Sequence, residues 1–210
     1  SYGLEGEEND SYGFIDRFWA EGSIYDKKGT IYSIPFNKST EVLFYNLDFF
    51  QAHAADLAKY GVAADGTWTK PTWDQVEGIA QYYLTSAEYN ALDAELKATA
   101  AGFSADSEAN LFITLTQQWG GAYTSIAADG KGSYDFNNAK SKEAISWFYN
   151  NYKNNLFGTS TKFGTDYSSD AFKAMQCIMT IGSSAGASYN TTSDFKTGVA
   201  EYPQRADGTN

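Results

Sequence analysis

The chain is poor in the residues that carry metal and redox chemistry. Its 210 residues include one cysteine, Cys177, and one histidine, His53. These counts exclude a disulfide within the chain and a metal site built from Cys and His ligands. Cys177 lies in an apolar run and is expected to be a buried small hydrophobe. His53 stands between two alanines of a predicted helix, so we expect a surface or packing role rather than a Ser–His–Asp site.

Basic residues are also scarce. Lys and Arg number 15 against 26 Asp and Glu, which gives a net charge of −11. Without a basic patch to neutralise phosphates, the chain's charge argues against nucleic-acid binding and against attachment to an anionic membrane surface. No run approaches the roughly 18 apolar residues of a membrane helix, and no signal peptide is present. We therefore expect a cytosolic chain or a mature or trimmed piece of an exported protein.

The usual catalytic and cofactor motifs are missing. The glycines match neither a phosphate-binding P-loop nor a dinucleotide fingerprint, and there is no Gly-x-Ser-x-Gly elbow. No cofactor and no metal are predicted. The 26 carboxylates leave a glycosidase pair open, but they cluster in turns and helix starts, where acidic residues are ordinarily solvated.

What the chain does have is aromatic residues and one informative segment. Aromatics make up 17%, with 16 Tyr and 5 Trp, and such rings suit sugar-binding sites. Within residues 32–46, two β-branched and aromatic runs at 31–36 and 42–45 predict strands. The polar residues 37–40 between them are either an ordinary β-turn or a ligand-facing turn.

Short strands alternate with helices along the rest of the chain, which predicts one α/β lobe over residues 1–210. The helices are expected at 14–19, 47–60, 72–83, 86–102, 108–119, 141–152 and 168–175, and further strands near Phe103 and at 177–181 and 199–202. Thr72 and Gln75 predict a capping box, and Ser107 a helix cap. Polar stretches end several elements, at 39–40, 104–110 and 182–184. Because ligands of open α/β sheets lie beyond the strand ends, these stretches favour binding over turnover.

Four segments together carry a resemblance to a known family. They are residues 32–46; Pro-Thr-Trp-Asp-Gln at 71–75; Trp-Gly-Gly at 119–121 followed by Tyr-Asp-Phe-Asn at 134–137; and residues 172–184, which end Met-Thr-Ile-Gly-Ser-Ser. In this order, and over most of residues 25–203, they resemble the extracellular solute-binding proteins of ABC importers, the group with the maltose- and glycerol-phosphate-binding proteins.

The resemblance implies a fold, and it implies that this chain is one part of that fold. The family's type II periplasmic-binding-protein fold has two lobes joined by crossover strands, each a three-layer α/β lobe with a mixed central sheet flanked by helices. This chain is similar to the second lobe alone, with crossovers expected near 31–36 and 199–202. The abrupt ending at 207–210 agrees with an excised domain, which we expect to fold alone but to bind ligand weakly.

The resemblance also implies site residues and partners. The implied ligand contacts are Ser39, Thr40, Glu108, Asn110, Ser183 and Ser184, with Trp119 either a stacking platform or a core residue. The implied partners are ABC permease subunits, and the implied protein is a monomer, extracellular and anchored as a lipoprotein or periplasmic. Because residues 185–187 lack the aromatic that sugar binders often have after the Gly-Ser loop, a phosphorylated polyol stays open beside a carbohydrate. A two-carboxylate carbohydrate hydrolase and a structural or adhesion domain are the alternatives of other classes.

Overall fold

A computed structural model describes residues 14–25 and 28–206. The chain divides into a short first unit, Ser1–Ser39, and a second, Thr40–Asn210, which we call the lobe. No helix in the described ranges is long and apolar enough to cross a membrane. The turn expected at 207–208 lies outside the described residues.

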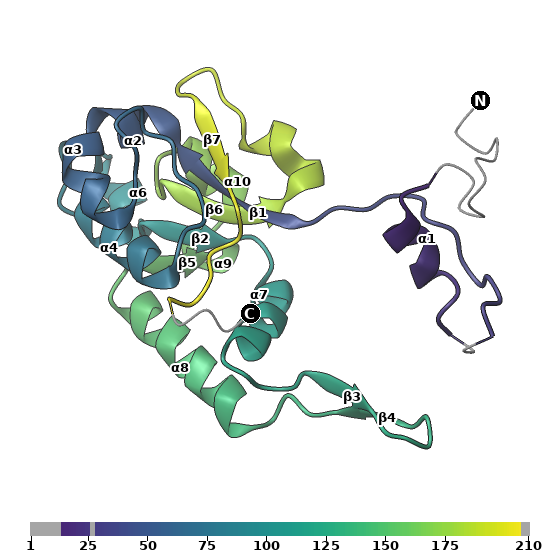
Figure 1. The fold of residues 1–210 in the computed structure, drawn as a ribbon. Coiled ribbons are helices and arrows are strands. Elements are labelled where there is room, and N and C mark those ends of the chain that lie inside the picture. The colour runs from purple at the N-terminus through teal and green to yellow at the C-terminus, as the bar shows by residue number, and fades with distance from the viewer. Residues whose placement is uncertain (1–13, 26–27, 207–210) are drawn as a thin grey trace. The chain divides into compact units, whose positions relative to one another are not determined.

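The first unit holds one short helix and an extended segment (Figure 1). Helix α1 spans Asp16–Glu21, close to the expected 14–19. The strand predicted at 31–36 is wrong, because these residues pair with no strand. Their apolar side chains are exposed, up to 100% for Phe36. Strand-forming residues are present, but a strand needs a partner to satisfy its backbone groups.

The centre of the lobe is a five-stranded sheet in the order β5-β2-β6-β1-β7 (Figure 1). The strands are β1 (Glu41–Asn46), β2 (Phe103–Ala105), β5 (Phe157–Thr159), β6 (Met179–Ser183) and β7 (Thr197–Ala200). Strand β2 runs parallel to β5 and β6, whereas β1 is antiparallel to both β6 and β7. The sheet is therefore mixed, as the resemblance implies.

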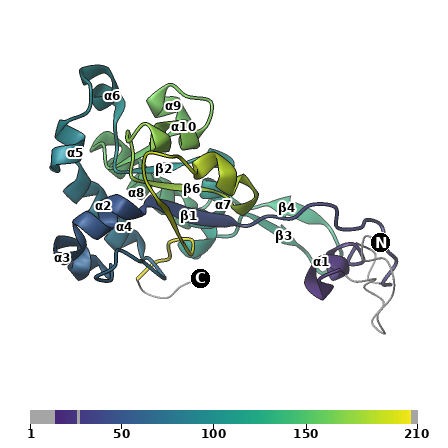
Figure 2. The ribbon, with the colours of Figure 1, turned by 90° about the horizontal axis from the view of Figure 1, so that it is seen from above.

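Alternate residues of β1 face two separate apolar layers. Leu43 and Tyr45 join the larger core with α2, α4, α7 and α8, whereas Phe44 joins a smaller one with Phe163 and Phe172. Because successive strand residues point to opposite faces, the sheet is covered on both sides. Figure 2 shows α9 and α10 on one side and α2, α3 and α4 on the other. The three-layer lobe is confirmed.

The helices largely follow the predicted pattern. They are α2 (Leu47–Ala52), α3 (Ala54–Leu57), α4 (Trp73–Tyr83), α5 (Ala87–Asn90), α6 (Ala94–Thr99), α7 (Glu108–Gln118), α8 (Ala139–Lys153), α9 (Ser160–Phe163) and α10 (Ser168–Lys173), with 3-10 turns η1 (Ala58–Tyr60) and η2 (Ser184–Asn190). The capping box of Thr72 and Gln75 is confirmed, and Ser107 accepts a hydrogen bond from the Asn110 N–H as a cap does.

Several predicted elements have different bounds. The helix expected at 47–60 breaks at His53, whose backbone leaves helical geometry at φ −110° and ψ 16°. The helix expected at 86–102 is two helices, α5 and α6. The strand expected at 177–181 begins at Met179 and continues through Gly182 and Ser183, because these residues pair with β1. Strand β7 begins two residues before the expected 199 and ends at Ala200.

A hairpin of β3 (Thr124–Ile126) and β4 (Gly132–Tyr134) extends from the lobe between α7 and α8 (Figure 1). Every residue of both strands is exposed. The sequence predicted only its tight turn at 129–132, where Gly130 adopts a positive φ of 85°.

Candidate ligand-binding site

The sheet register gathers the ends of its strands at one edge. Because β1 is antiparallel to β6 and β7, its first residues lie beside their last ones, as the pairing of Glu41 with Ser183 shows. Strands β2 and β5 run parallel to β6, so they end at the same edge. Ligands of open α/β sheets bind beyond the carboxyl ends of strands. We call this edge the ligand edge.

Thr40 and Ser184 are joined at the ligand edge. The Ser184 N–H donates to the Thr40 carbonyl at 2.7 Å, and the Thr40 N–H donates to Ser184 Oγ at 3.2 Å. Ser183 Oγ accepts from the Ala185 N–H at 3.2 Å. The hydroxyl oxygens of both serines therefore hold the η2 turn, while their O–H groups are still able to donate to a ligand.

Glu41 and the start of α7 form the second group at this edge. Asn110 Nδ2 donates to Glu41 Oε1 at 3.2 Å. Burial raises the pKa of Glu41, the Asn110 hydrogen bond lowers it, and the nearby Asp106 carboxylate raises it again, so that it ends above its ordinary value. Glu108 turns toward α9, where its Oε1 is 3.5 Å from Thr161 Oγ1.

A cavity of about 340 Å³ opens beside the end of β6. It is lined by Asp106, Tyr167, Ser169, Asp170, Lys173, Gly182, Ser183, Gly186, Tyr189 and Asn190. Tyr167 and Tyr189 are 63% and 70% exposed, so their rings offer apolar faces at its mouth. Asn190 is 6% exposed, and its buried Oδ1 accepts no hydrogen bond from the described residues. The cavity thus combines aromatic faces with polar groups, among them the Ser183 hydroxyl and the carboxylates of Asp106 and Asp170.

The charges of this cavity are mostly negative. Asp106 Oδ1 accepts from the Ser168 N–H at 2.8 Å, which holds the carboxylate at the start of α10. Lys173 is the one cation among the lining residues, and its Nζ is 3.1 Å from Asp170 Oδ1. The cation is therefore already matched by a neighbouring carboxylate.

The other predicted site residues lie elsewhere. Trp119 follows the last residue of α7, at the opposite end of that helix from Glu108. It packs against Trp147 at 4.9 Å between ring centroids, and the Arg205 guanidinium lies 4.6 Å from its ring. With Trp73 and Asp74 these residues line a separate cavity of about 380 Å³. Ser39 belongs to the first unit.

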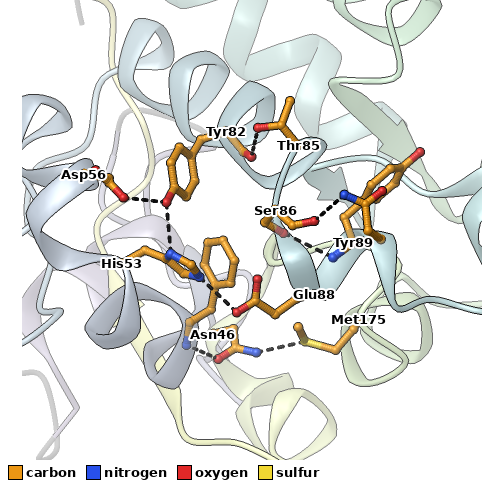
Figure 3. A network of polar contacts seen from close by, with 11 residues as sticks. Asn46, His53, Asp56, Tyr82, Thr85, Ser86, Glu88, Tyr89 and Met175 are labelled. Carbon is orange, nitrogen blue, oxygen red and sulfur yellow. Dashed lines mark hydrogen bonds and ion pairs between the residues drawn. The ribbon is translucent and has the colours of Figure 1, made fainter.

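His53 takes part in a polar network (Figure 3). Its Nε2 is 2.9 Å from Glu88 Oε1, and its Nδ1 is 2.9 Å from the Tyr82 hydroxyl, which donates to Asp56 Oδ2 at 2.8 Å. None of these residues lines a cavity described above. The network joins α3, α4 and α5, so His53 has the packing role expected of it, although it stands at a helix break rather than within a helix.

The sequence did not single out Tyr167, Tyr189, Asp106 or Asn190. Asp106 lies within the polar stretch 104–110, from which the resemblance implies only Glu108 and Asn110 as ligand contacts. The two tyrosines carry no local signal, because only the fold brings the turns before α10 and within η2 to one cavity. Across residues 14–25 and 28–206, no three His, Cys, Asp or Glu side chains are grouped to hold a metal ion.

Comparisons with known proteins identify the fold. No protein-family model and no curated protein matches the sequence. Among solved structures, the chain is similar to an ABC substrate-binding protein from Listeria monocytogenes in complex with cycloalternan, with a TM-score of 0.68 and 21% identity. It is also similar to an ABC transporter solute-binding protein from Agrobacterium vitis S4 with bound D-mannitol, with a TM-score of 0.62 and 16% identity.

These matches cover 95% and 97% of this chain but 45% of each of the two solved chains. The chain therefore spans less than half the length of its structural neighbours. Its described part has the fold of one portion of an ABC solute-binding protein, as the resemblance in its sequence implies.

Proposed function

We propose that the chain is the ligand-binding lobe of an ABC-transporter solute-binding protein that captures an uncharged carbohydrate or polyol. The observation that carries this proposal is the cavity at the ligand edge, with two exposed tyrosine rings around polar groups. Sugars present apolar ring faces and hydroxyls, and such a lining complements both. The two structural neighbours were solved with cycloalternan and D-mannitol, which are an oligosaccharide and a polyol.

The charges favour a neutral ligand over a phosphorylated polyol. Asp106 and Asp170 line the cavity, and its one cation, Lys173, is paired with Asp170. A phosphate would meet net negative charge without a free cation to balance it. Hydroxyls, in contrast, can donate to the carboxylates of Asp106 and Asp170.

The tyrosines replace the missing aromatic of the Gly-Ser loop. Tyr189 lies within η2, five residues after Ser184, and Tyr167 lies just before α10. Around them, Thr40, Asn110, Ser183 and Ser184 complete the polar wall of the ligand edge. Glu108 adds a carboxylate at the start of α7. Trp119 and Ser39 stay candidate contacts for a ligand that extends beyond this cavity.

The role of the whole protein is part of the same proposal and rests on the fold. The whole protein would close a second lobe over the ligand and deliver it to ABC permease subunits, without catalysis. It would act as a monomer outside the cell, as a lipoprotein or a periplasmic protein. Since the chain spans less than half of its neighbours, we expect its own affinity to be lower than that of the whole protein.

The test is an NMR titration of the ¹⁵N-labelled 210-residue chain with D-mannitol, cycloalternan and glycerol 3-phosphate. We expect a neutral ligand to shift amides of residues 183–190 and 106–110. Tyr189→Ala should weaken binding about fivefold, because an aromatic contact contributes about 1 kcal/mol. Tyr149→Ala is the matched control, since this tyrosine is similarly exposed but lies on α8.

Two results would overturn the proposal. One is preferential binding of glycerol 3-phosphate over both neutral ligands. The other is the appearance of shortened or opened sugars, detected by chromatography during the titration. If substitution of an Asp or Glu residue abolished this turnover, the result would support the hydrolase.

A further inference from the structure

Four polar side chains from separate elements meet around the imidazole of His53 (Figure 3). The ring follows α2, Asp56 lies on α3, Tyr82 on α4 and Glu88 on α5. Nε2 contacts Glu88 Oε1 at 2.9 Å, Nδ1 contacts the Tyr82 hydroxyl at 2.9 Å, and that hydroxyl contacts Asp56 Oδ2 at 2.8 Å. We call these four residues the His53 cluster.

The three contacts of the His53 cluster need three protons. An ionised carboxylate only accepts, so Nε2 must carry a proton to donate to Glu88. The Tyr82 hydroxyl has one proton and donates it to Asp56, so its oxygen can only accept from Nδ1. All three hydrogen bonds therefore form together only when both ring nitrogens carry protons, which makes His53 a cation.

A neutral imidazole has one proton too few for these contacts. With the remaining proton on Nε2, which faces Glu88, Nδ1 becomes an acceptor. The Tyr82 hydroxyl can then donate to His53 or to Asp56, and one of these two is left without its donor. The His53–Glu88 pair also loses its charge attraction, which solvent screens incompletely because the two side chains are 21% and 35% exposed.

The groups around the imidazole favour its charged form. Those that face it or its partners are the Asp56 and Glu88 carboxylates and the hydroxyls of Tyr82 and Tyr83. Within the described residues, neither carboxylate is paired with a lysine or an arginine. In that part of the chain, the ring is therefore the cation that balances them.

We infer that the His53 cluster is a proton-dependent latch, which joins α3, α4 and α5 firmly when the imidazole is doubly protonated and loosely when it is neutral. Histidine is the side chain whose charge ordinarily changes between pH 5 and pH 8, so the latch acts in that range. Because the folded chain then binds this proton more tightly than the unfolded chain does, stability falls as the pH rises through the range.

Glu88 sets the acid limit of the latch. Burial raises the pKa of Glu88, but the contact with His53, its own backbone N–H and Ser86 lower it further, so that it ends below its ordinary value of 4.5. Such a carboxyl stabilises the fold above its ordinary pKa and loses this contribution as the pH falls through its folded value. The latch is therefore closed above the titration of Glu88 and below that of the imidazole.

The experiment measures urea unfolding of the 210-residue chain by tryptophan fluorescence at pH 5.5 and pH 7.5. Since His53 is the chain's one histidine, it is the side chain whose ordinary titration falls between these values. We expect the equilibrium constant of unfolding to rise about fivefold from pH 5.5 to pH 7.5, because the folded chain loses one hydrogen bond of the cluster.

Two variants separate the latch from the net charge of the chain. Glu88→Gln leaves an acceptor for the ring but removes the charge that favours its doubly protonated form, so we expect the rise to shrink to less than about twofold. Glu95→Gln is the matched control, because it makes the same change of charge at an exposed position of α6. It should keep the full rise.

A second readout needs no variant and follows the ring itself. Two-bond ¹H–¹⁵N NMR spectra of the ¹⁵N-labelled chain show which nitrogen of its single imidazole carries a proton. We expect protons on both nitrogens at pH 5.5. After the ring has lost one proton, at pH 9, we expect the other to remain on Nε2, because this nitrogen faces Glu88.

Three results would overturn the latch. One is an equal rise in the wild-type chain and in Glu88→Gln, and another is a rise that Glu95→Gln reduces as much as Glu88→Gln does. The third is a neutral ring with its proton on Nδ1. The ligand edge lies at the start of β1, whereas α2 and His53 follow its end, so these results leave the proposed function untouched.

Discussion

Phe44→Ala should destabilise the lobe by about 3–5 kcal/mol, the usual cost of emptying a core phenylalanine site. Phe44 is 1% exposed and lies at the middle of β1. It is the residue of this strand whose side chain is fully buried in the smaller of the two cores. That core has few other large side chains, among them Phe163, Phe172 and Phe195. The loss therefore weakens the packing of the α9–α10 layer on the sheet. For a chain of this size we expect the melting temperature to fall by 2–4 °C per kcal/mol, or roughly 6–20 °C.

Val199→Ala is the internal control, because Val199 is the register partner of Phe44 on β7 yet is 57% exposed. Its truncation should change stability by about 0.5 kcal/mol or less. Phe44→Leu covers the case in which the alanine variant does not fold, and should cost about 1–2 kcal/mol. Urea unfolding followed by tryptophan fluorescence measures all three. Equal stabilities for Phe44→Ala and Val199→Ala would refute the second covered face and with it the three-layer lobe.

Two further predictions concern stability. Thr72→Ala removes the acceptor for the Gln75 N–H in the capping box and should cost about 1 kcal/mol by urea unfolding. A cost no larger than that of Thr69→Ala, at an exposed position outside the helices, would contradict it. Burial and the bond to Asp56 raise the pKa of Tyr82 from 10.0 to about 12, so the unfolded chain loses this proton first and stability should fall as the pH rises between these values. Tyr82→Phe should lessen that fall in alkaline unfolding curves, and an unchanged slope would contradict the assignment.

The sequence predicted correctly those features that depend on residues close together in the chain, such as helix caps. The capping box at Thr72 and the cap at Ser107 both depend on residues a few positions apart, and both are present. The strand predicted at 31–36 failed for the opposite reason. Its residues favour a strand, but a strand is made by its neighbour, and among the described residues this segment has none. Beta structure therefore depends on distant pairing that composition does not encode.

The candidate site shows the same division. The resemblance named Thr40, Asn110, Ser183 and Ser184, and the register of β1 with β6 brings them to one edge. It did not name Tyr167 or Tyr189, because these lie in separate turns whose positions in the sequence carry no shared pattern. It did name Trp119, which the structure places at the other end of α7, in contact with Trp147 and Arg205.

Residue type alone is a poor guide to which polar groups are free to bind. His53 is the chain's one histidine and chemically its most versatile side chain, yet both ring nitrogens are already occupied, by Tyr82 and Glu88. Glu41 is one of 26 carboxylates, and nothing in its local sequence distinguishes it. Its Oε1 nevertheless meets Asn110 of α7 at the ligand edge, because the fold brings the start of β1 beside the start of that helix. Which polar groups are free to bind is therefore decided by the partners that the fold gives them and not by residue type.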